Sequence, residues 1–174
     1  CGRNHRTVKS QFGPCFNMVK QDIVQTALVT SLRYLSPKAR SAFEIRKRLR
    51  LGGYDRATTD TVIQMLIERG LLNDKLFADT WCQNRFLFRP RSAWLVNREL
   101  RAKGISKQIA DEAVESINDM SAAYKAGSVI LNRIDLSDHN RFVRKMYGYL
   151  ARRGFGRATI RKATSDLWDN RCRS

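Results

Sequence analysis

The sequence predicts an all-α protein made of three tandem three-helix repeats, stacked into an elongated and curved array. Two observations predict this fold class. Apolar side chains recur at the spacing of amphipathic helices, and no segment alternates with the two-residue period of a strand. The chain also repeats itself, with Leu49, Leu100 and Leu150 at intervals of 51 and 50 residues. A repeat of this length is typical of helical units that stack on their neighbours.

Each copy of the repeat marks the end of one helix and the approach to the next. An apolar residue precedes the leucine by four positions, a glycine follows it by four, and another apolar residue comes next. The apolar pair at four-residue spacing predicts a buried helix face, and the glycine predicts the helix end because it adopts a left-handed backbone readily. The copies are Ile45, Leu49, Gly53 and Tyr54; Val96, Leu100, Gly104 and Ile105; and Met146, Leu150, Gly154 and Phe155.

A further helix is predicted ahead of each of these helix pairs. Residues 24–35 carry apolar side chains at helical spacing, as do residues 77–88, which follow the N-cap candidate Asn73. Ala126, Val129, Ile130 and Ile134 make a weaker pattern of the same kind. Proline is tolerated in the first turn of a helix, so Pro37 and Pro90 predict where the middle helices of the first two repeats begin.

These patterns divide the chain into five parts. The first twenty residues contain basic side chains and no acid, which suggests a flexible basic arm. The predicted parts are an N-terminal arm at 1–20, repeat 1 at 21–72, repeat 2 at 73–119, repeat 3 at 120–169 and a tail at 170–174.

The charge balance indicates an anionic partner. The chain has 33 Lys and Arg against 16 Asp and Glu, for a net charge of +17 and a pI near 10.5. Such an excess attracts nucleic acid, an anionic membrane surface or an acidic protein. No apolar run reaches the roughly 20 residues of a membrane helix, so we expect no membrane association.

The sequence offers no arrangement for catalysis. It lacks the glycine-rich phosphate loop with its Lys-Ser/Thr pair, and neither histidine has a suitable nucleophile nearby. The cysteines form no closely spaced pair, which favours free thiols in a reducing cytoplasm over a zinc site or disulfides. We therefore expect a cytoplasmic protein that is not an enzyme, with no cofactor and no metal. The residues concerned are Cys1, Cys15, Cys82, Cys172, His5 and His139.

Basic residues gather around the second helix of each predicted repeat and the turn that follows it. Repeated along a stacked array, these clusters would form a continuous positive stripe suited to a phosphate backbone. A basic surface kept only for solubility is the alternative. The first cluster is Arg46, Lys47, Arg48 and Arg50; the second is Arg89, Arg91, Arg98, Arg101 and Lys103; the third is Arg144, Lys145, Arg152, Arg153, Arg157, Arg161 and Lys162.

Aromatic residues interleave with the second cluster and could stack on bases or grip a protein. We expect Phe77 and Trp81 to lie in the core because they share a helix face. We expect Phe86 and Trp94 to be exposed. Trp168 should pack on the last repeat, and one of Tyr147 and Tyr149 should face solvent because they cannot share a helix face.

Three segments resemble the RecX family of regulatory proteins. They are GLLNDKLFADTWCQNR (residues 70–85), RELRAKGI (residues 98–105) and AFEIRKRLRLGGY (residues 42–54). The resemblance spans roughly residues 22–168 and includes the family's three three-helix repeats. It implies a regulator of the RecA recombinase that binds the groove of the RecA–single-stranded DNA filament. Members of the family modulate the filament, usually by inhibiting ATP hydrolysis and strand exchange, in DNA repair and the SOS response. The partners it implies are the RecA filament and single-stranded DNA, contacted directly or through the filament.

Other functions remain open from the residues alone. Three-helix units resemble helix-turn-helix readers, so the chain could bind DNA or RNA by itself, as a dimer on a duplex site. The chain has no heptad pattern for dimerisation, and we expect a monomer. A scaffold for an acidic protein is a second alternative, and catalysis is a third.

Overall fold

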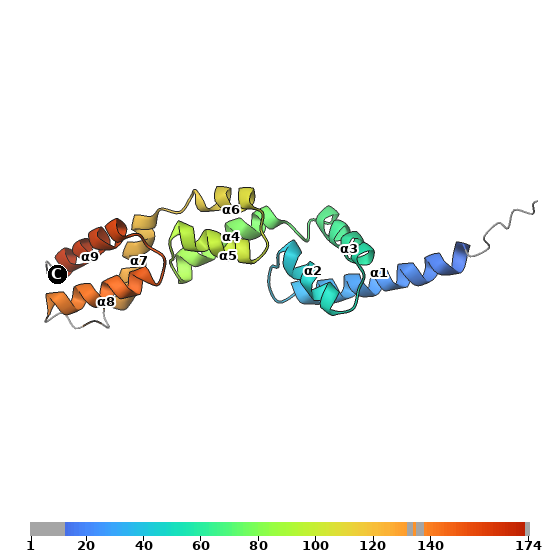
Figure 1. Ribbon diagram of the computed structural model, residues 1–174, viewed down its shortest axis with the longest axis horizontal. Coiled ribbons are helices and arrows are strands. Elements are labelled where there is room, and N and C mark those ends of the chain that lie inside the picture. The colour runs from blue at the N-terminus through green and yellow to red at the C-terminus, as the bar shows by residue number, and fades with distance from the viewer. Residues whose placement is uncertain (1–12, 132–133, 135–137, 173–174) are drawn as a thin grey trace, which may run out of the picture. The chain divides into compact units, whose positions relative to one another are not determined.

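The computed structural model describes residues 13–131, 134 and 138–172, and these residues form nine helices and no strand (Figure 1). The all-α prediction is therefore confirmed. Residues 13–20 of the predicted arm belong to the first helix, while residues 1–12 lie outside the described part. The helices are α1 (Gly13–Leu35), α2 (Ala42–Leu51), α3 (Arg56–Glu68), α4 (Asp74–Phe88), α5 (Ala93–Ala102), α6 (Lys107–Val114), α7 (Asp119–Leu131), α8 (His139–Ala151) and α9 (Arg157–Cys172).

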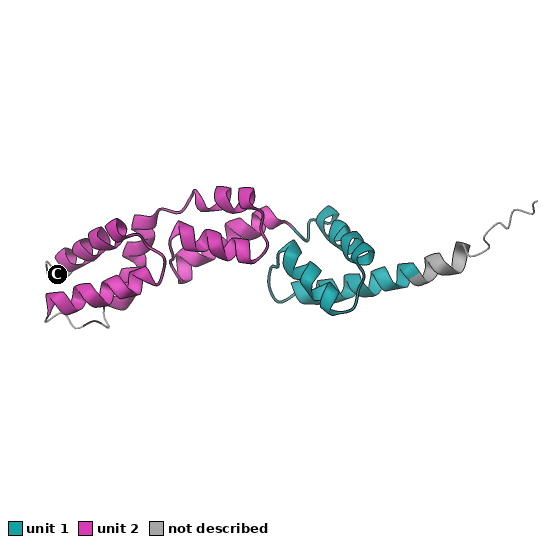
Figure 2. Cartoon of the chain, in the orientation of Figure 1, with its two compact units in different colours: residues 1–72 teal, residues 73–174 magenta. Residues whose placement is uncertain are grey.

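The chain forms two compact units that meet in sequence between Leu72 and Asn73 (Figure 2). In the first unit, α1, α2 and α3 pack on one another around a single apolar core. The apolar residues of the repeat lie in this core, with Ile45 and Leu49 fully buried. The core consists of Ala27, Leu28, Ala42, Ile45, Leu49, Val62, Ile63, Leu66 and Leu72.

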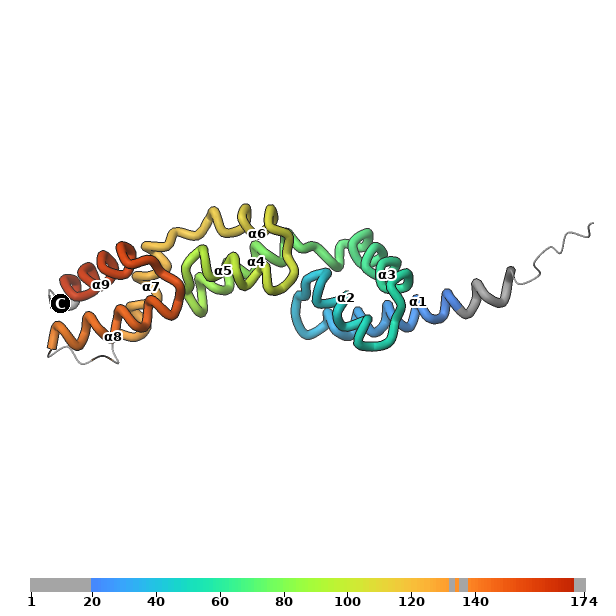
Figure 3. The backbone as a smooth tube through the Cα atoms, viewed as in Figure 1, coloured from blue at the N-terminus to red at the C-terminus, as the bar shows by residue number. Residues whose placement is uncertain are grey.

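The second unit consists of two groups of three helices, α4–α6 and α7–α9 (Figure 3). Each group has an apolar core of its own. The apolar residues of the repeat again supply their centres: Val96 and Leu100 are fully buried in one, and Met146 and Leu150 in the other. Trp168 packs against Phe142 in the second of these cores, as predicted, with ring centroids 5.1 Å apart.

Each middle helix ends on the glycine that the repeat predicts. Gly53, Gly104 and Gly154 have φ values of 83°, 79° and 84°, a left-handed backbone that favours glycine. The residue after each glycine donates its backbone N–H to the carbonyl of the repeat leucine, for example Ile105 to Leu100 at 3.1 Å. The predicted helix ends are therefore confirmed.

The predicted helix starts are partly wrong. The middle helices begin after Ser41 and Ser92, whose hydroxyls accept the N–H groups of Glu44 and Leu95 at 3.2 Å. Pro37 and Pro90 lie in the preceding loops, outside the first helical turn. A serine side chain satisfies a free N–H at the helix start, whereas proline only tolerates the position. Asn73 does cap α4, as predicted.

The weak pattern of the last repeat extends beyond its helix. Helix α7 ends at Leu131, so Ile134 is not helical, although it is buried in the α7–α9 core. Val129 is exposed instead of facing that core. Among the described residues, no helix combines the length and apolarity needed to span a bilayer.

Candidate partner-binding surface

Backbone and side-chain contacts join the α4–α6 and α7–α9 bundles at the start of α5. The N–H of Ser92 donates to the carbonyl of Arg153 at 3.0 Å, and the N–H of Ala93 donates to Asp119 Oδ1 at 2.7 Å. A side chain at Gly154 would have its Cβ only 2.6 Å from Ser92 Oγ, so the two bundles meet closely there. These contacts hold the start of α5 against the turn that follows α8 and against the start of α7.

Glu99 on α5 binds three donors from around the end of α4. Its carboxylate accepts the indole N–H of Trp81 at 2.9 Å and the Nε of Arg85 at 2.6 Å, and it pairs with Arg91. The Glu99 side chain is only 14% exposed, so water screens these pairs weakly. Arg91, a predicted binding residue, therefore has its charge compensated within the protein.

Three other cations of the second cluster contact aromatic rings or a backbone carbonyl of their own bundle. The Arg98 guanidinium lies 4.9 Å from the centre of the exposed Trp94 ring, and Lys103 Nζ lies 4.7 Å from the Trp81 ring. Arg101 donates to the carbonyl of Ile105 at 2.6 Å. Arg89 follows α4 and is exposed. Arg98 and Arg101 therefore combine surface exposure with contacts inside the bundle, whereas Lys103 is half-buried and Arg89 makes no such contact with a described residue.

The third cluster has no acid within residues 141–162. Arg144, Lys145 and Arg152 are exposed on α8 and its C-terminal turn, around a hollow of about 410 Å³ beside Tyr149. None of these three side chains pairs with an acid in the described part of the chain. Arg153 differs, because its guanidinium stacks 3.5 Å from the Tyr149 ring and burial lowers its pKa. The structure thus separates Arg153 from its three neighbours.

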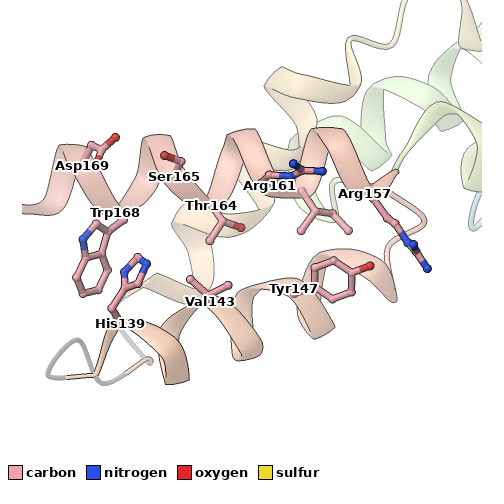
Figure 4. Close-up of a pocket in the computed structure, with 10 residues that line it drawn as sticks. His139, Val143, Tyr147, Arg157, Arg161, Thr164, Ser165, Trp168 and Asp169 are labelled. Carbon is pink, nitrogen blue, oxygen red and sulfur yellow. The ribbon is translucent and has the colours of Figure 1, made fainter.

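Helix α9 carries the remaining cations of this cluster. Arg157 and Arg161 are exposed and line a groove of about 400 Å³ between α8 and α9 (Figure 4). Neither forms an ion pair with any described residue. Lys162 pairs with Asp166 at 2.8 Å, and this hydrogen bond raises the pKa of the lysine.

The first cluster lies on α2 in the first unit. Arg46 approaches Asp60 at 3.7 Å, while Lys47, Arg48 and Arg50 are exposed. Each basic cluster therefore lies on a described surface of its own unit. The continuous stripe through all three clusters stays a prediction.

Most of the aromatic predictions are confirmed: Phe77 is buried, Trp94 is exposed, and Tyr147 rather than Tyr149 faces solvent. Trp81 is half-buried and packs against the edge of the α4–α6 core, so its prediction is confirmed only in part. The prediction for Phe86 is wrong: this ring is half-buried against the α7–α9 core, where Lys125 Nζ lies 4.5 Å from its centre. Its position between the two bundles is a long-range contact that the periodicity of α4 does not contain.

Two acids that organise the surface were not predicted from the sequence. Glu99 and Asp119 act across helices, and the only sequence signal for Glu99 was a single acid among the arginines of the second cluster. Within the described ranges, no three His, Cys, Asp or Glu side chains gather as a metal site would require. Burial raises the pKa of the Cys82 thiol to about 11, so this cysteine is neutral at physiological pH.

Comparison with known proteins gives a consistent set of relatives. Residues 27–66 match the first three-helix domain of RecX, and residues 73–114 match the second. A regulatory protein RecX from Amycolatopsis mediterranei is 31% identical over 124 residues, covering 70% of this chain and 71% of the relative. Another from Prosthecochloris aestuarii is 29% identical over 148 residues, covering 83% and 95%.

Two solved structures share the fold. A crystal structure of RecX from Lactobacillus salivarius superposes with a TM-score of 0.72 at 22% identity, over 84% of this chain and 97% of that one. A second crystal structure of regulatory protein RecX gives a TM-score of 0.76 at 18% identity, over 92% and 82%.

Proposed function

This chain belongs to the RecX family of regulatory proteins, and we propose that it regulates the RecA recombinase. In this proposal it binds the groove of the RecA–single-stranded DNA filament and inhibits ATP hydrolysis and strand exchange. It acts as a monomer in the cytoplasm, without a cofactor. RecA and single-stranded DNA are the partners that the family resemblance implies.

The observation that carries the proposal is a set of exposed cations without partners in the described part of the protein. Lys47, Arg48, Arg50 and Arg89 are such cations on α2 and after α4. The larger group belongs to the acid-free stretch that spans α8 and the first half of α9, and none of its members is stacked or paired with a described residue. A cation that meets no acid among the described residues is available to a phosphate or a carboxylate of another molecule. The group consists of Arg144, Lys145, Arg152, Arg157 and Arg161.

Electrostatics explains how such a surface would act. Phosphates attract exposed cations such as Arg144, Lys145 and Arg152 over about a Debye length, roughly 8–10 Å at moderate salt, and binding releases counterions. Affinity should therefore fall as salt is raised. Position on the filament would depend on the rigid joint at Gly154, because it fixes α8 and α9 relative to α5.

The second basic cluster supports the fold as well as binding. Reversing Arg98, Arg101 and Lys103 to Glu would remove their ring and carbonyl contacts together with their charge. Loss of binding in that variant would therefore have two explanations. Residues of α8 give a cleaner test, because Arg144 and Lys145 make no such contact in the described part of the chain.

The proposal is tested by titrating the protein into RecA that hydrolyses ATP on single-stranded DNA. The same DNA alone serves as a parallel binding control. We expect inhibition at protein concentrations well below those that coat free DNA. Inhibition that follows DNA coating would contradict the proposal and would favour a nucleic-acid-binding protein that acts alone.

A further inference from the structure

We propose that the groove between α8 and α9 is a docking site for an acidic peptide segment that carries apolar side chains. Helices α8 and α9 run antiparallel along the two sides of the groove (Figure 4). The floor is apolar, with half-buried Val143 and fully buried Ile160. A volume of about 400 Å³ is within the usual range for ligand sites, roughly 300–1,000 Å³.

In each of the other two bundles, a polar contact joins the second and third helices at the equivalent positions of the repeat. Arg46 reaches Asp60 at 3.7 Å between α2 and α3, and the amide of Asn97 donates to Asp111 at 2.8 Å between α5 and α6. In the register of the repeat, Tyr147 and Arg161 occupy these two positions in α8 and α9. An arginine replaces the acid in α9, so the polar contact between the second and third helices cannot form in this bundle.

This replacement predicts the chemistry of the missing partner. Arg161 and Arg157 lie one turn apart on α9, and neither is paired with a described acid. A carboxylate from another chain would stand where Asp60 and Asp111 stand in the other bundles. An Arg–carboxylate pair of this kind is strong because the guanidinium can donate two hydrogen bonds at once.

The ends of the groove favour a peptide over a nucleic acid. Arg157 marks one end, while Asp169 lies at the other beside Trp168 (Figure 4). Twelve residues of helix separate these ends by about 18 Å. A phosphate chain is charged along its whole length and would meet Asp169 unfavourably. A peptide can place acids at the arginine end and apolar side chains against Val143 and Trp168.

A buried hydroxyl group without a hydrogen bond also lines the groove. Thr164 is 5% exposed and lines the groove, and its Oγ1 has no hydrogen-bond partner among the described residues. In Figure 4 its side chain points between the two helices, toward Val143. A buried hydroxyl gains free energy from a partner, and the backbone of an extended peptide supplies carbonyl groups at regular spacing.

Charge disfavours the chain itself as the occupant. The first twenty residues carry Arg3, Arg6, Lys9 and Lys20 and no acid, so the arginines of the groove would repel them. A second copy of the chain would bring a further net charge of +17. The occupant we propose is therefore a segment of a different, acidic protein.

The test measures binding of a fluorescein-labelled octapeptide, Glu-Glu-Glu-Leu-Ser-Leu-Phe-Ser, by fluorescence anisotropy. We expect saturable binding to the full chain. Arg161→Asp should weaken it at least about ten-fold, because it restores the acid found in the other bundles and removes the attractive charge. Arg144→Asp is the matched control, with the same charge change on the other side of α8, and should weaken binding less than about three-fold.

Three further measurements distinguish binding of an acidic apolar peptide from binding by charge alone and from binding of nucleic acid. Tyr147→Ala removes an apolar wall without changing charge and should weaken binding about five-fold. A peptide with serine in place of leucine and phenylalanine should not bind, and oligodeoxythymidine should not displace the acidic apolar peptide. Equal losses in Arg161→Asp and Arg144→Asp, tight binding of the serine peptide, or displacement by the oligonucleotide would each overturn the proposal. None of these outcomes depends on RecA.

Discussion

The second and third predicted repeats place basic residues alike but surround them differently. The position before the repeat leucine is Glu99 in α5 and Tyr149 in α8. Glu99 gathers Arg85, Arg91 and the indole of Trp81, whereas Tyr149 only stacks with Arg153. The residue at this one position, acidic in α5 and aromatic in α8, therefore determines whether neighbouring cations stabilise the fold or remain available to a partner.

The third helices of these two bundles, α6 and α9, differ in the same way. Asp111 in α6 accepts hydrogen bonds from Asn97 and Lys107, and these hydrogen bonds lower its pKa. The equivalent residue in α9 is Arg161, which lines an open groove. The α4–α6 bundle therefore pairs the charges around Glu99 and Asp111 internally, and the α7–α9 bundle leaves the equivalent positions to solvent or to a partner.

Substitution of Glu99 should lower the free energy of unfolding more than any other change considered below. Glu99→Gln removes a carboxylate from two arginines whose side chains are 22% and 33% exposed, and leaves them without full compensation. We expect a loss of about 3 kcal/mol in the free energy of unfolding, measured by urea denaturation. Glu112→Gln is the control: this exposed acid pairs with Lys75 at 3.7 Å and should cost less than about 0.5 kcal/mol. Equal losses would show that Glu99 does not organise the bundle.

A smaller effect is expected at the joint between the two bundles. Gly154→Ala should cost about 2 kcal/mol more than Gly53→Ala. Both glycines have a left-handed backbone, but a Cβ at Gly53 meets open space, while one at Gly154 meets Ser92 Oγ at 2.6 Å and Leu95 Cβ at 2.8 Å. Denaturation of the two variants under identical conditions gives the comparison. Equal costs would mean that the bundles do not meet tightly at α5.

Much of the fold could be predicted because it depends on local spacing. The pairs Ile45–Leu49, Val96–Leu100 and Met146–Leu150 lie on single helix faces, and the following glycines end their helices through backbone geometry alone. Helix starts were harder, since Ser41 and Ser92 compete with nearby prolines as signals and only capping geometry distinguishes them.

The sequence predicted which basic residues belong to the candidate surface, but not which of them pair with acids of the protein. The sequence identified which residues are basic, yet pairing depends on contacts between helices. Arg91 and Glu99 lie eight residues apart on a loop and a helix, and Phe86 meets the α7–α9 core across a longer stretch of chain. Repeat periodicity does not encode such contacts, so it could not separate compensated from available cations.

In the proposed function, available cations of the third predicted repeat bind the partner, and basic charge in general does not. The most direct test compares Arg144→Glu/Lys145→Glu with Lys75→Glu/Lys107→Glu in the RecA ATPase titration on single-stranded DNA. Both double variants change the net charge equally, but Lys75 and Lys107 are exposed cations paired with Glu112 and Asp111. We predict that the α8 variant raises the half-inhibiting concentration about ten-fold, and the control less than about three-fold. Equal shifts in the two variants would contradict the claim.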